Sequence, residues 1–286
     1  MSTTLDAANA RRHNVYLPHP QHAGMIRALL GKAIADRLLL AGIVGASMIG
    51  MGALIGALWP PMRDTFADIS SGLLDGMMKA LPGADLTSAT GWANAELMSM
   101  VAPAAAIAVA VISAARATAG EEEAKTLGVL LSAPVARVTF LSAKAAAMAI
   151  HVLIVGGCLA TGLVVGNVIG NLGLTANGIV GATAHTVLVG IAFGTLALLI
   201  GAGTGNRRLT TATTGALAAL AFAMSTFLPL SDALADGAKF SPWYYFSASN
   251  PLLNGADPGH LIVLATCAVL PALVAAVVFH MRDLRG

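Results

Sequence analysis

The segment GEEEAKTLGVLLSAPVARVTFLSAK, residues 120–144, is a charged stretch between two long apolar regions. Its three consecutive glutamates suit the first turn of a helix, where unpaired backbone N–H groups and the positive end of the helix dipole favour carboxylates. Leucines then recur at helical spacing until Ala133-Pro134, where the proline disfavours helical geometry in the residue before it. Arg137 and Lys144 follow, as basic residues do at the cytoplasmic mouth of a span. The segment therefore predicts a short cytoplasmic helix over 121–132, between two membrane spans.

The composition indicates an integral membrane protein. Of the 286 residues, 57% are hydrophobic and only 10% are charged, and the mean hydropathy is +0.78. Because soluble proteins average about 25% charged residues, a large soluble domain does not fit in this chain. The net charge of +2 is too small to indicate nucleic-acid binding. Cys158 and Cys267 both lie in apolar runs, where a cysteine packs as a small hydrophobe.

We predict an all-α polytopic membrane protein with six transmembrane helices. Predominantly apolar runs long enough to cross a hydrocarbon core of roughly 30 Å lie at about 38–59, 95–115, 140–168, 179–201, 209–230 and 260–280. They belong to one transmembrane domain over 23–286, which follows a polar segment, 1–22, that we expect to be disordered and not a cleavable signal peptide.

Prolines and glycines indicate how individual spans are shaped. Trp59-Pro60-Pro61 is expected to end the first span, and Pro103 to kink the second. In the third span, four glycines are expected to let another helix approach closely; they are Gly156, Gly157, Gly162 and Gly166.

The segments that flank the spans leave alternatives. Residues 23–37 separate apolar and charged side chains, which fits either an interfacial helix on the inner leaflet or an extension of the first span. After that span, apolar residues repeat at helical spacing up to Leu81, which fits a surface helix or a loop packed on the other external loop. That other loop, 231–259, concentrates aromatic residues, and we expect short re-entrant or surface helices in it.

The basic residues predict that both termini are cytoplasmic. Only Arg63, Lys79 and Lys239 fall in predicted external segments, whereas the other thirteen of the sixteen lysines and arginines fall on the opposite side. An excess of lysine and arginine marks cytoplasmic loops.

Motifs for an ATP site or a membrane-embedded hydrolase do not occur. The sequence contains no G-x-x-x-x-G-K-[ST], H-E-x-x-H or G-x-S-x-G. His151 and His185 lie in mid-span without a deep acidic partner, so they are expected to be neutral, hydrogen-bonded to helices, or lining a path. The N-terminal histidines lack the spacing and the companions of a metal site, and no metal ligand is assigned. An embedded enzyme remains an alternative, as does an ion-coupled secondary transporter or channel, although its usual buried acids are missing.

The residue order from Glu121 to Arg137, E-E-E-x-x-T-L-x-x-L-L-S-x-P-V-x-R, resembles the cytoplasmic loop of type-2 ATP-binding-cassette (ABC) permeases, exporter subunits with six spans. The segments SPWYY, residues 241–245, and NPLLNG, residues 250–255, look like the last external loop of that family. The resemblance covers most of the chain from about residue 23 onward. It implies an N-terminal elbow helix and, over 121–132, a coupling helix that sits in a cleft of a separate ATPase subunit.

By this resemblance the chain is the permease subunit of an ABC exporter in the inner or plasma membrane, paired with a second permease chain, identical or different. ATP and Mg would bind to the ATPase subunit, and this chain would bind no cofactor and be no enzyme. Family members export drugs, lipids, glycans or ions, and the sequence does not select among these substrates.

The resemblance also implies site residues. Spans two and five would face each other across a dimer axis, and weak candidates for the substrate path are Met98, Met100, Phe222 and Phe227. Coupling to the ATPase would involve Glu121, Glu122, Glu123, Thr126, Leu127, Leu130, Leu131, Pro134 and Arg137. We expect the glutamates to be exposed and to pair with basic residues of the ATPase, each pair contributing about 0–1 kcal/mol.

Overall fold

The computed structural model describes residues 20–68, 88–123 and 136–281, and these ranges are all-α. Six helical segments in them are long and apolar enough to cross a membrane; they are Arg27–Thr65, Ala89–Gly120, Arg137–Gly170, Ala176–Thr204, Arg207–Leu230 and Pro258–Met281. Each predicted span lies inside one of them. The all-α class and the six spans are therefore confirmed, and the chain is a multi-pass membrane protein.

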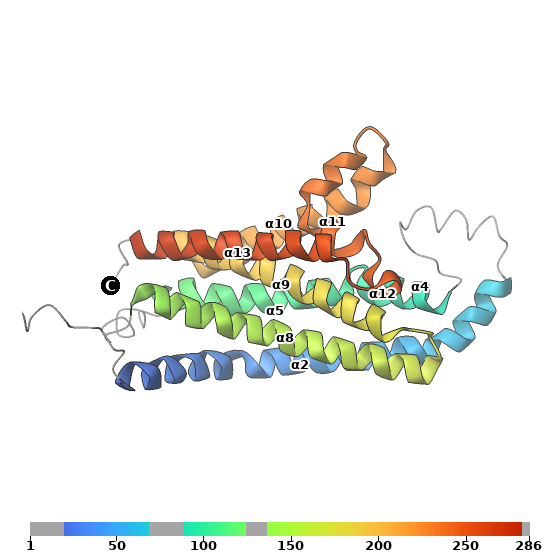
Figure 1. Ribbon diagram of the computed structural model, residues 1–286, viewed down its shortest axis with the longest axis horizontal. Helices are drawn as coiled ribbons and strands as arrows, with labels where there is room; N and C mark the ends of the chain where they lie inside the picture. Colours follow the sequence, from blue (N-terminus) through green and yellow to red (C-terminus); the bar gives the residue numbers. More distant parts are fainter. Residues whose placement is uncertain (1–19, 69–87, 124–135, 282–286) are drawn as a thin grey trace, which may run out of the picture.

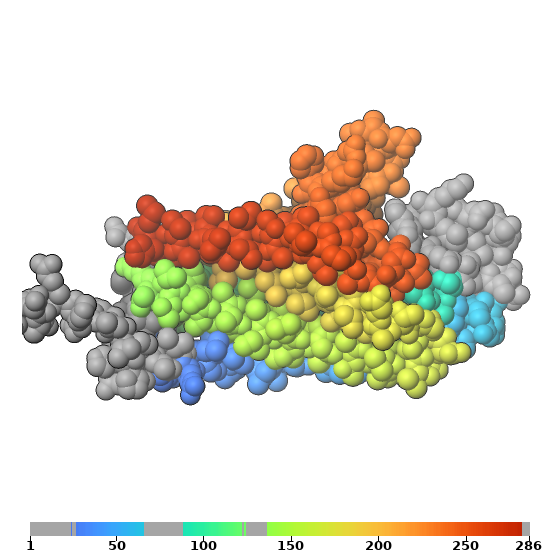
Figure 2. All heavy atoms as spheres, viewed as in Figure 1, coloured from blue at the N-terminus to red at the C-terminus, as the bar shows by residue number. Residues whose placement is uncertain are grey.

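The long helices form one elongated bundle (Figure 1). The helices of the bundle are α2 (Pro20–Asp68), α5 (Val101–Ala115), α8 (Arg137–Gly170), α9 (Ala176–Thr204), α10 (Arg207–Phe227) and α13 (Pro258–Met281). The central helix is α9, because it packs against α5, α8, α10 and α13. The outer helices are exposed, and Figure 2 shows α13 lying along one face of the molecule.

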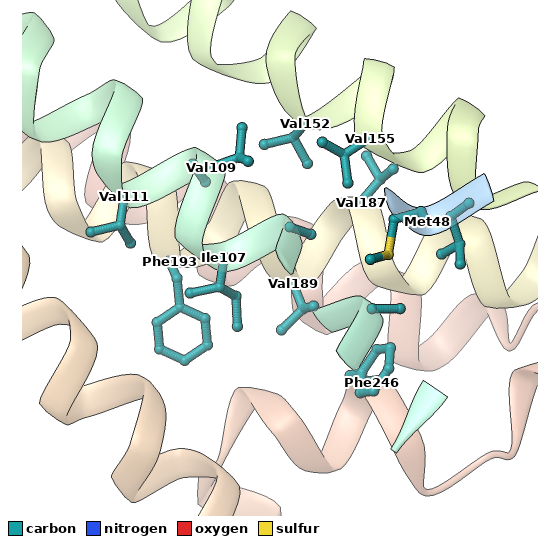
Figure 3. Packing of buried hydrophobic residues seen from close by; sticks show 14 of the residues in the cluster. Met48, Ile107, Val109, Val111, Val152, Val155, Val187, Val189, Phe193 and Phe246 are labelled. Atoms are coloured by element: carbon teal, nitrogen blue, oxygen red, sulfur yellow. The ribbon is translucent and has the colours of Figure 1, made fainter. Parts of the chain in front are cut away.

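The packed interior lies between α5, α8 and α9, where branched side chains interdigitate (Figure 3). In a membrane, close van der Waals contact replaces the hydrophobic effect as the force that holds helices together. Small and branched residues between these helices therefore keep the bundle tight. Among those that Figure 3 labels are Ile107, Val109, Val152, Val155, Val187, Val189 and Phe193.

The first span is one continuous helix. Since α2 runs from Pro20 through Asp68, residues 23–37 extend the span, and the separate elbow helix is wrong. The expected helix end at Trp59-Pro60-Pro61 is also wrong, because both prolines lie inside α2. Figure 1 shows α2 bending toward its C-terminal end, as a helix does where prolines remove backbone N–H donors and displace carbonyls. Most of the external segment up to Leu81 lies outside the described residues.

The helices α2 and α8 run in the same direction and touch backbone to backbone. A Cβ added at Gly52 would lie 2.7 Å from the Cα of Gly162, and one added at Gly56 would lie 2.7 Å from the Cα of Gly166. Glycines spaced four residues apart leave a helix face bare, so that a neighbour can approach. Close approach is thus confirmed at Gly162 and Gly166, and at Gly156 it is α9 that comes close, through Val187. The expectation of close approach is wrong for Gly157, which faces open space.

The second span is interrupted rather than merely kinked. It consists of α4 (Ala89–Ala93), the π-helical turn η1 (Asn94–Met98), then α5, the π-helical turn η2 (Arg116–Gly120) and α6 (Glu121–Glu123). The break falls at Ser99 and Met100, and Pro103 is the third residue of α5. A proline in the first turn of a helix costs no hydrogen bond, because that N–H would be unpaired anyway. Pro103 therefore starts a new helix instead of bending an old one.

Short helices cover the end of the bundle where α10 ends and α13 begins, as predicted for 231–259. They are η3 (Leu228–Leu230), η4 (Ala235–Phe240), α11 (Pro242–Ser247) and α12 (Pro251–Asn254). The hydroxyl of Ser241 donates to the carbonyl of Ala221 at 2.7 Å, which fastens this loop to α10. Asp257 accepts the backbone N–H of His260 at 3.0 Å, which caps α13 and lowers the pKa of that carboxyl.

Candidate functional site

The end of the bundle where α2, α8 and α10 begin holds the first residues of the predicted coupling helix. It is reached through η2, a π-helical turn, and such turns are frequent at functional sites. The turn packs closely on α9, because Gly201 has no side chain where Thr118 lies against it. Thr118 itself is buried and donates its hydroxyl to the carbonyl of Ala114 at 3.2 Å. The entry to the coupling helix is thus fixed against the centre of the bundle.

A buried ion pair joins this entry to the third span. The Nζ of Lys144, in α8, lies 2.9 Å from the Oε1 of Glu121, the first residue of α6. The side chain of Lys144 is only 7% exposed, and that of Glu121 is 14% exposed. Removing one partner of such a pair leaves an uncompensated charge away from water, which is strongly unfavourable. Glu121 and Lys144 therefore hold α6 against α8.

The contacts continue from Lys144 to the sixth span. Its ammonium lies 5.4 Å from the centre of the Phe140 ring, within the range of a cation–π interaction. Phe140 stacks on Phe279 of α13, with ring centres 6.1 Å apart. Arg137, at the start of α8, donates from Nη1 to the carbonyl of His280 at 3.4 Å. Both ends of the segment 121–137 are thus connected, directly or through one residue, to membrane-spanning helices.

Glu123 makes a third connection, to the fifth span. Its Oε1 accepts the backbone N–H of Arg207, the first residue of α10, at 2.8 Å. Asn206 caps the same helix, because its side chain accepts the N–H of Leu209 at 2.8 Å. A carboxylate at a helix N-terminus is stabilised by the unpaired N–H groups and the helix dipole. Glu121 and Glu123 therefore link the start of the predicted coupling helix to α8 and to α10.

These contacts change the expectation for the glutamates. Glu121 is not exposed, and its ion pair lies within the chain, so the expectation of an exposed, weakly contributing Glu121 is wrong. Glu123 is exposed, but its carboxylate is engaged by α10. The rest of the predicted coupling set lies outside the described residues, apart from Arg137; this part comprises the Glu122 side chain, Thr126, Leu127, Leu130, Leu131 and Pro134.

The four candidates for the substrate path lie in different environments. Met98 is buried in the core of the chain, and Phe222 packs edge-on against Trp243, with ring centres 5.1 Å apart. Met100 and Phe227 are exposed. Only these last two present a large apolar surface to whatever lies outside the chain.

The two mid-span histidines are bonded to helices, as one of the expected alternatives has it. The Nε2 of His151 lies 2.9 Å from the carbonyl oxygen of Ile34, and Nδ1 lies 3.2 Å from the hydroxyl of Ser113. Because a carbonyl only accepts, Nε2 carries the proton, and a neutral ring then accepts from Ser113. His151 thus connects α2, α5 and α8, whereas His185 bonds within α9, 2.9 Å from the Gly181 carbonyl.

Sequence reasoning missed Lys144, which it placed at the mouth of a span. The available signal was its position: Lys144 is followed by an uncharged run through span three, and the nearest acidic residues in the sequence are the triplet that begins at Glu121. A lysine at the edge of a hydrocarbon core needs a partner or a route to the surface. Pairing within the chain follows from that requirement.

Comparison with known families adds an independent finding. A family model described as the C-terminal domain of the multidrug efflux system permease Rv1217c matches residues 33–280, which is most of the chain. No curated protein matches the chain. The matched region includes all six spans apart from residues 27–32 of the first and Met281 of the last. This protein therefore belongs to the permease family represented by the C-terminal domain of the multidrug efflux system permease Rv1217c.

Proposed function

We propose that the chain is the membrane subunit of an ABC exporter that moves drug-like compounds, driven by a separate ATPase subunit. The observation that carries this proposal is the attachment of the coupling segment: Glu121 is paired with Lys144 of α8, and Glu123 with the N-terminus of α10. A force applied to residues 121–132 by a partner would reach two spans through these rigid contacts. The absence of an ATP-binding motif from the sequence assigns hydrolysis, with ATP and Mg, to that partner.

Drug-like compounds are proposed as substrates because the matched family is described as a multidrug efflux permease. The cavity at the cytoplasmic end of the chain has a volume of about 20 Å³. Sites for drug-sized ligands measure roughly 300–1,000 Å³, so this cavity is not the transport site. We infer that the route forms between two permease chains.

An exposed face of α10 supports the proposal that a second permease chain packs against this helix. Four small residues of this helix are exposed at helical spacing; they are Ala212, Gly215, Ala216 and Ala219. Small residues let helices of neighbouring chains approach closely in a membrane. Met100 and Phe227, which are exposed, remain candidates for the route on this proposal, whereas Met98 and Phe222 would act only through packing.

Co-purification tests the proposal. The permease is expressed with the ATPase subunits encoded beside it, purified, and weighed by native mass spectrometry, and two permease chains with two ATPase domains are expected. Leu130→Asp places a carboxylate on the proposed apolar docking face and is expected to lower ATPase recovery at least about tenfold, a loss of about 1.4 kcal/mol. The control is Leu253→Asp, the same change at an exposed leucine of the external helix α12.

Equal ATPase recovery with Leu130→Asp and Leu253→Asp would show that coupling runs through another segment, such as the turn at Asn206. A transporting complex with a single permease chain and no second membrane subunit would contradict the two-chain arrangement.

The cytoplasmic location of both termini is a further prediction, based on the lysine and arginine bias. In a variant without native cysteines, made by Cys158→Ala and Cys267→Ala, Ser231→Cys should react with a membrane-impermeant maleimide in intact cells. Arg208→Cys should react only after the cells are opened. Both positions are exposed on the chain, so accessibility depends on the side of the membrane alone. The reverse labelling pattern would show that the predicted topology is wrong and that both termini lie outside.

A further inference from the structure

Arginines from three helical elements lie near one another at the cytoplasmic end. Arg37 of α2 interacts electrostatically with Arg116 of η2 and Arg207 of α10, and repulsion from each is stronger than attraction from Asp36. None of the three guanidinium groups pairs with a carboxylate in the part of the chain that the structure describes. Like charges that lie near one another repel, and a bound anion would relieve that repulsion.

The arginines border a recess that is too small for a substrate. The charged residues that line the cavity of about 20 Å³ are Arg37, Arg116 and Lys144 and the carboxylates Asp36 and Glu121, and Ser113 and His151 line it as well. This volume holds one water-sized group, such as a single oxygen atom of a larger anion. Lys144 is already neutralised by Glu121. Asp36 offsets the charge of one of the two arginines, so the recess keeps a net positive charge from Arg37 and Arg116.

One donor at the recess lacks an acceptor. The Nε of Arg37 is buried and has no hydrogen-bond partner among the described residues. Leaving a buried donor of a charged group unsatisfied is costly. The recess thus combines an unpaired N–H donor, room for one oxygen atom and an excess of positive charge beside it.

The depth of the recess identifies the source of the anion. Arg37 immediately precedes Leu38 and Leu39, which are exposed and begin the lipid-facing surface of α2. The guanidinium therefore lies at the level of the lipid headgroups, on the side where the basic residues place the cytoplasm. Anionic lipids are enriched in that leaflet, and basic pockets between transmembrane helices bind their headgroups. Guanidinium groups match phosphate with paired hydrogen bonds.

We propose that Arg37, Arg116 and Arg207 bind the phosphate of an anionic lipid of the inner leaflet, with one phosphate oxygen in the recess. The bound phosphate accepts the Nε–H of Arg37 and removes the mutual repulsion of the three arginines. It also connects α2, η2 and α10 beside the coupling segment, so the lipid stabilises the cytoplasmic end of the bundle. This inference does not depend on the identity of the exported compound or on the ATPase.

The test uses the full chain, purified in neutral detergent and stripped of lipid. Phosphatidylglycerol, phosphatidylcholine and inorganic phosphate are added separately, and thermal unfolding and native mass spectrometry are recorded. Phosphatidylglycerol is expected to bind about tenfold more tightly than phosphatidylcholine. Arg37→Gln should abolish this preference. The control is Arg27→Gln, which removes the same charge from an exposed position of α2 that does not line the recess, and should keep it.

The remaining outcomes separate the alternatives. Stabilisation by inorganic phosphate that Arg37→Gln removes would support the same site with a free phosphate as its ligand. Equal binding of both lipids, or equal losses with Arg37→Gln and Arg27→Gln, would overturn the proposal. The proposal would also be overturned if the Arg37→Gln chain keeps the lipid preference but no longer binds the ATPase. In that case the arginines would pair with a carboxylate of the partner protein and not with a lipid. If Arg37→Gln does not fold, Arg207→Gln replaces it, since Arg207 is exposed and its removal leaves no cavity.

Discussion

Lys144→Met is expected to destabilise the protein by about 3–5 kcal/mol, the usual cost of breaking one partner out of a buried ion pair. The methionine fills most of the volume of the lysine, so the loss comes from the carboxylate of Glu121, which is left buried without its cation. The double variant Lys144→Met/Glu121→Met removes both charges and is expected to recover most of that loss. The cycle is measured by reversible chemical unfolding in mixed micelles.

The exposed ion pair within η4 supplies the control. Lys239 and Asp236 are only 2.7 Å apart, but their side chains are 57% and 92% exposed. Water screens such a pair, so Lys239→Met should cost far less than Lys144→Met. If Lys144→Met costs no more than Lys239→Met, or if the two single changes at Lys144 and Glu121 simply add, then the buried pair does not hold the coupling segment.

The six spans could be predicted from the sequence because the bilayer imposes simple rules. A span needs a charge-free run of a certain length, and basic residues accumulate at its cytoplasmic ends. Both rules are read from neighbouring residues, without knowledge of the fold. An irregularity in the second span could also be predicted locally, from Pro103 alone. The structure shows a break there, whereas the sequence predicts a kink.

The ion pair could not be predicted in that way. Glu121 and Lys144 are 23 positions apart, and whether they meet depends on how η2 packs on α9 and how α8 lies beside it. Read locally, a glutamate in the first turn of a helix and a lysine at a span end are both satisfied by solvent. Only the packing of the helices removes the water and makes them partners.

The sequence also could not predict the direction in which a residue of a helix faces. Adjacent residues of a helix point about 100° apart, because one turn holds 3.6 residues. Gly156 and Gly157 are equivalent in the sequence, yet only Gly156 meets a neighbouring helix. Met98 and Met100 differ likewise, since the break at Ser99 and Met100 turns one inward and leaves the other exposed. Apolar residues in a membrane carry no pattern that distinguishes lipid from protein contact.

The glycine contact between α2 and α8 is expected to tolerate no large side chain, and Gly166→Leu should prevent the chain from folding. A Cβ at this position would lie 3.0 Å from the carbonyl carbon of Gly52 and closer still to its oxygen. Because the obstacle is backbone, no rotamer change relieves it, and α2 must move away from α8 along its length. Overpacking usually costs about 1–3 kcal/mol, and we expect more here because two backbones have to separate.

Gly157→Leu is the matched control, since Gly157 lies in the same helix, is exposed, and has no atom within 4 Å of an added Cβ. That leucine would point toward lipid, where an apolar side chain is accommodated, so its yield and melting temperature should equal those of the unmodified chain. Size-exclusion chromatography in detergent and resistance to trypsin measure the folded fraction of both variants. Gly166→Leu is expected to aggregate or to be digested under conditions in which Gly157→Leu stays intact. Two folded variants of equal stability would show that α2 and α8 do not need the close backbone contact, and that other contacts, such as that of His151 with Ile34, are enough to fix the first span to the third.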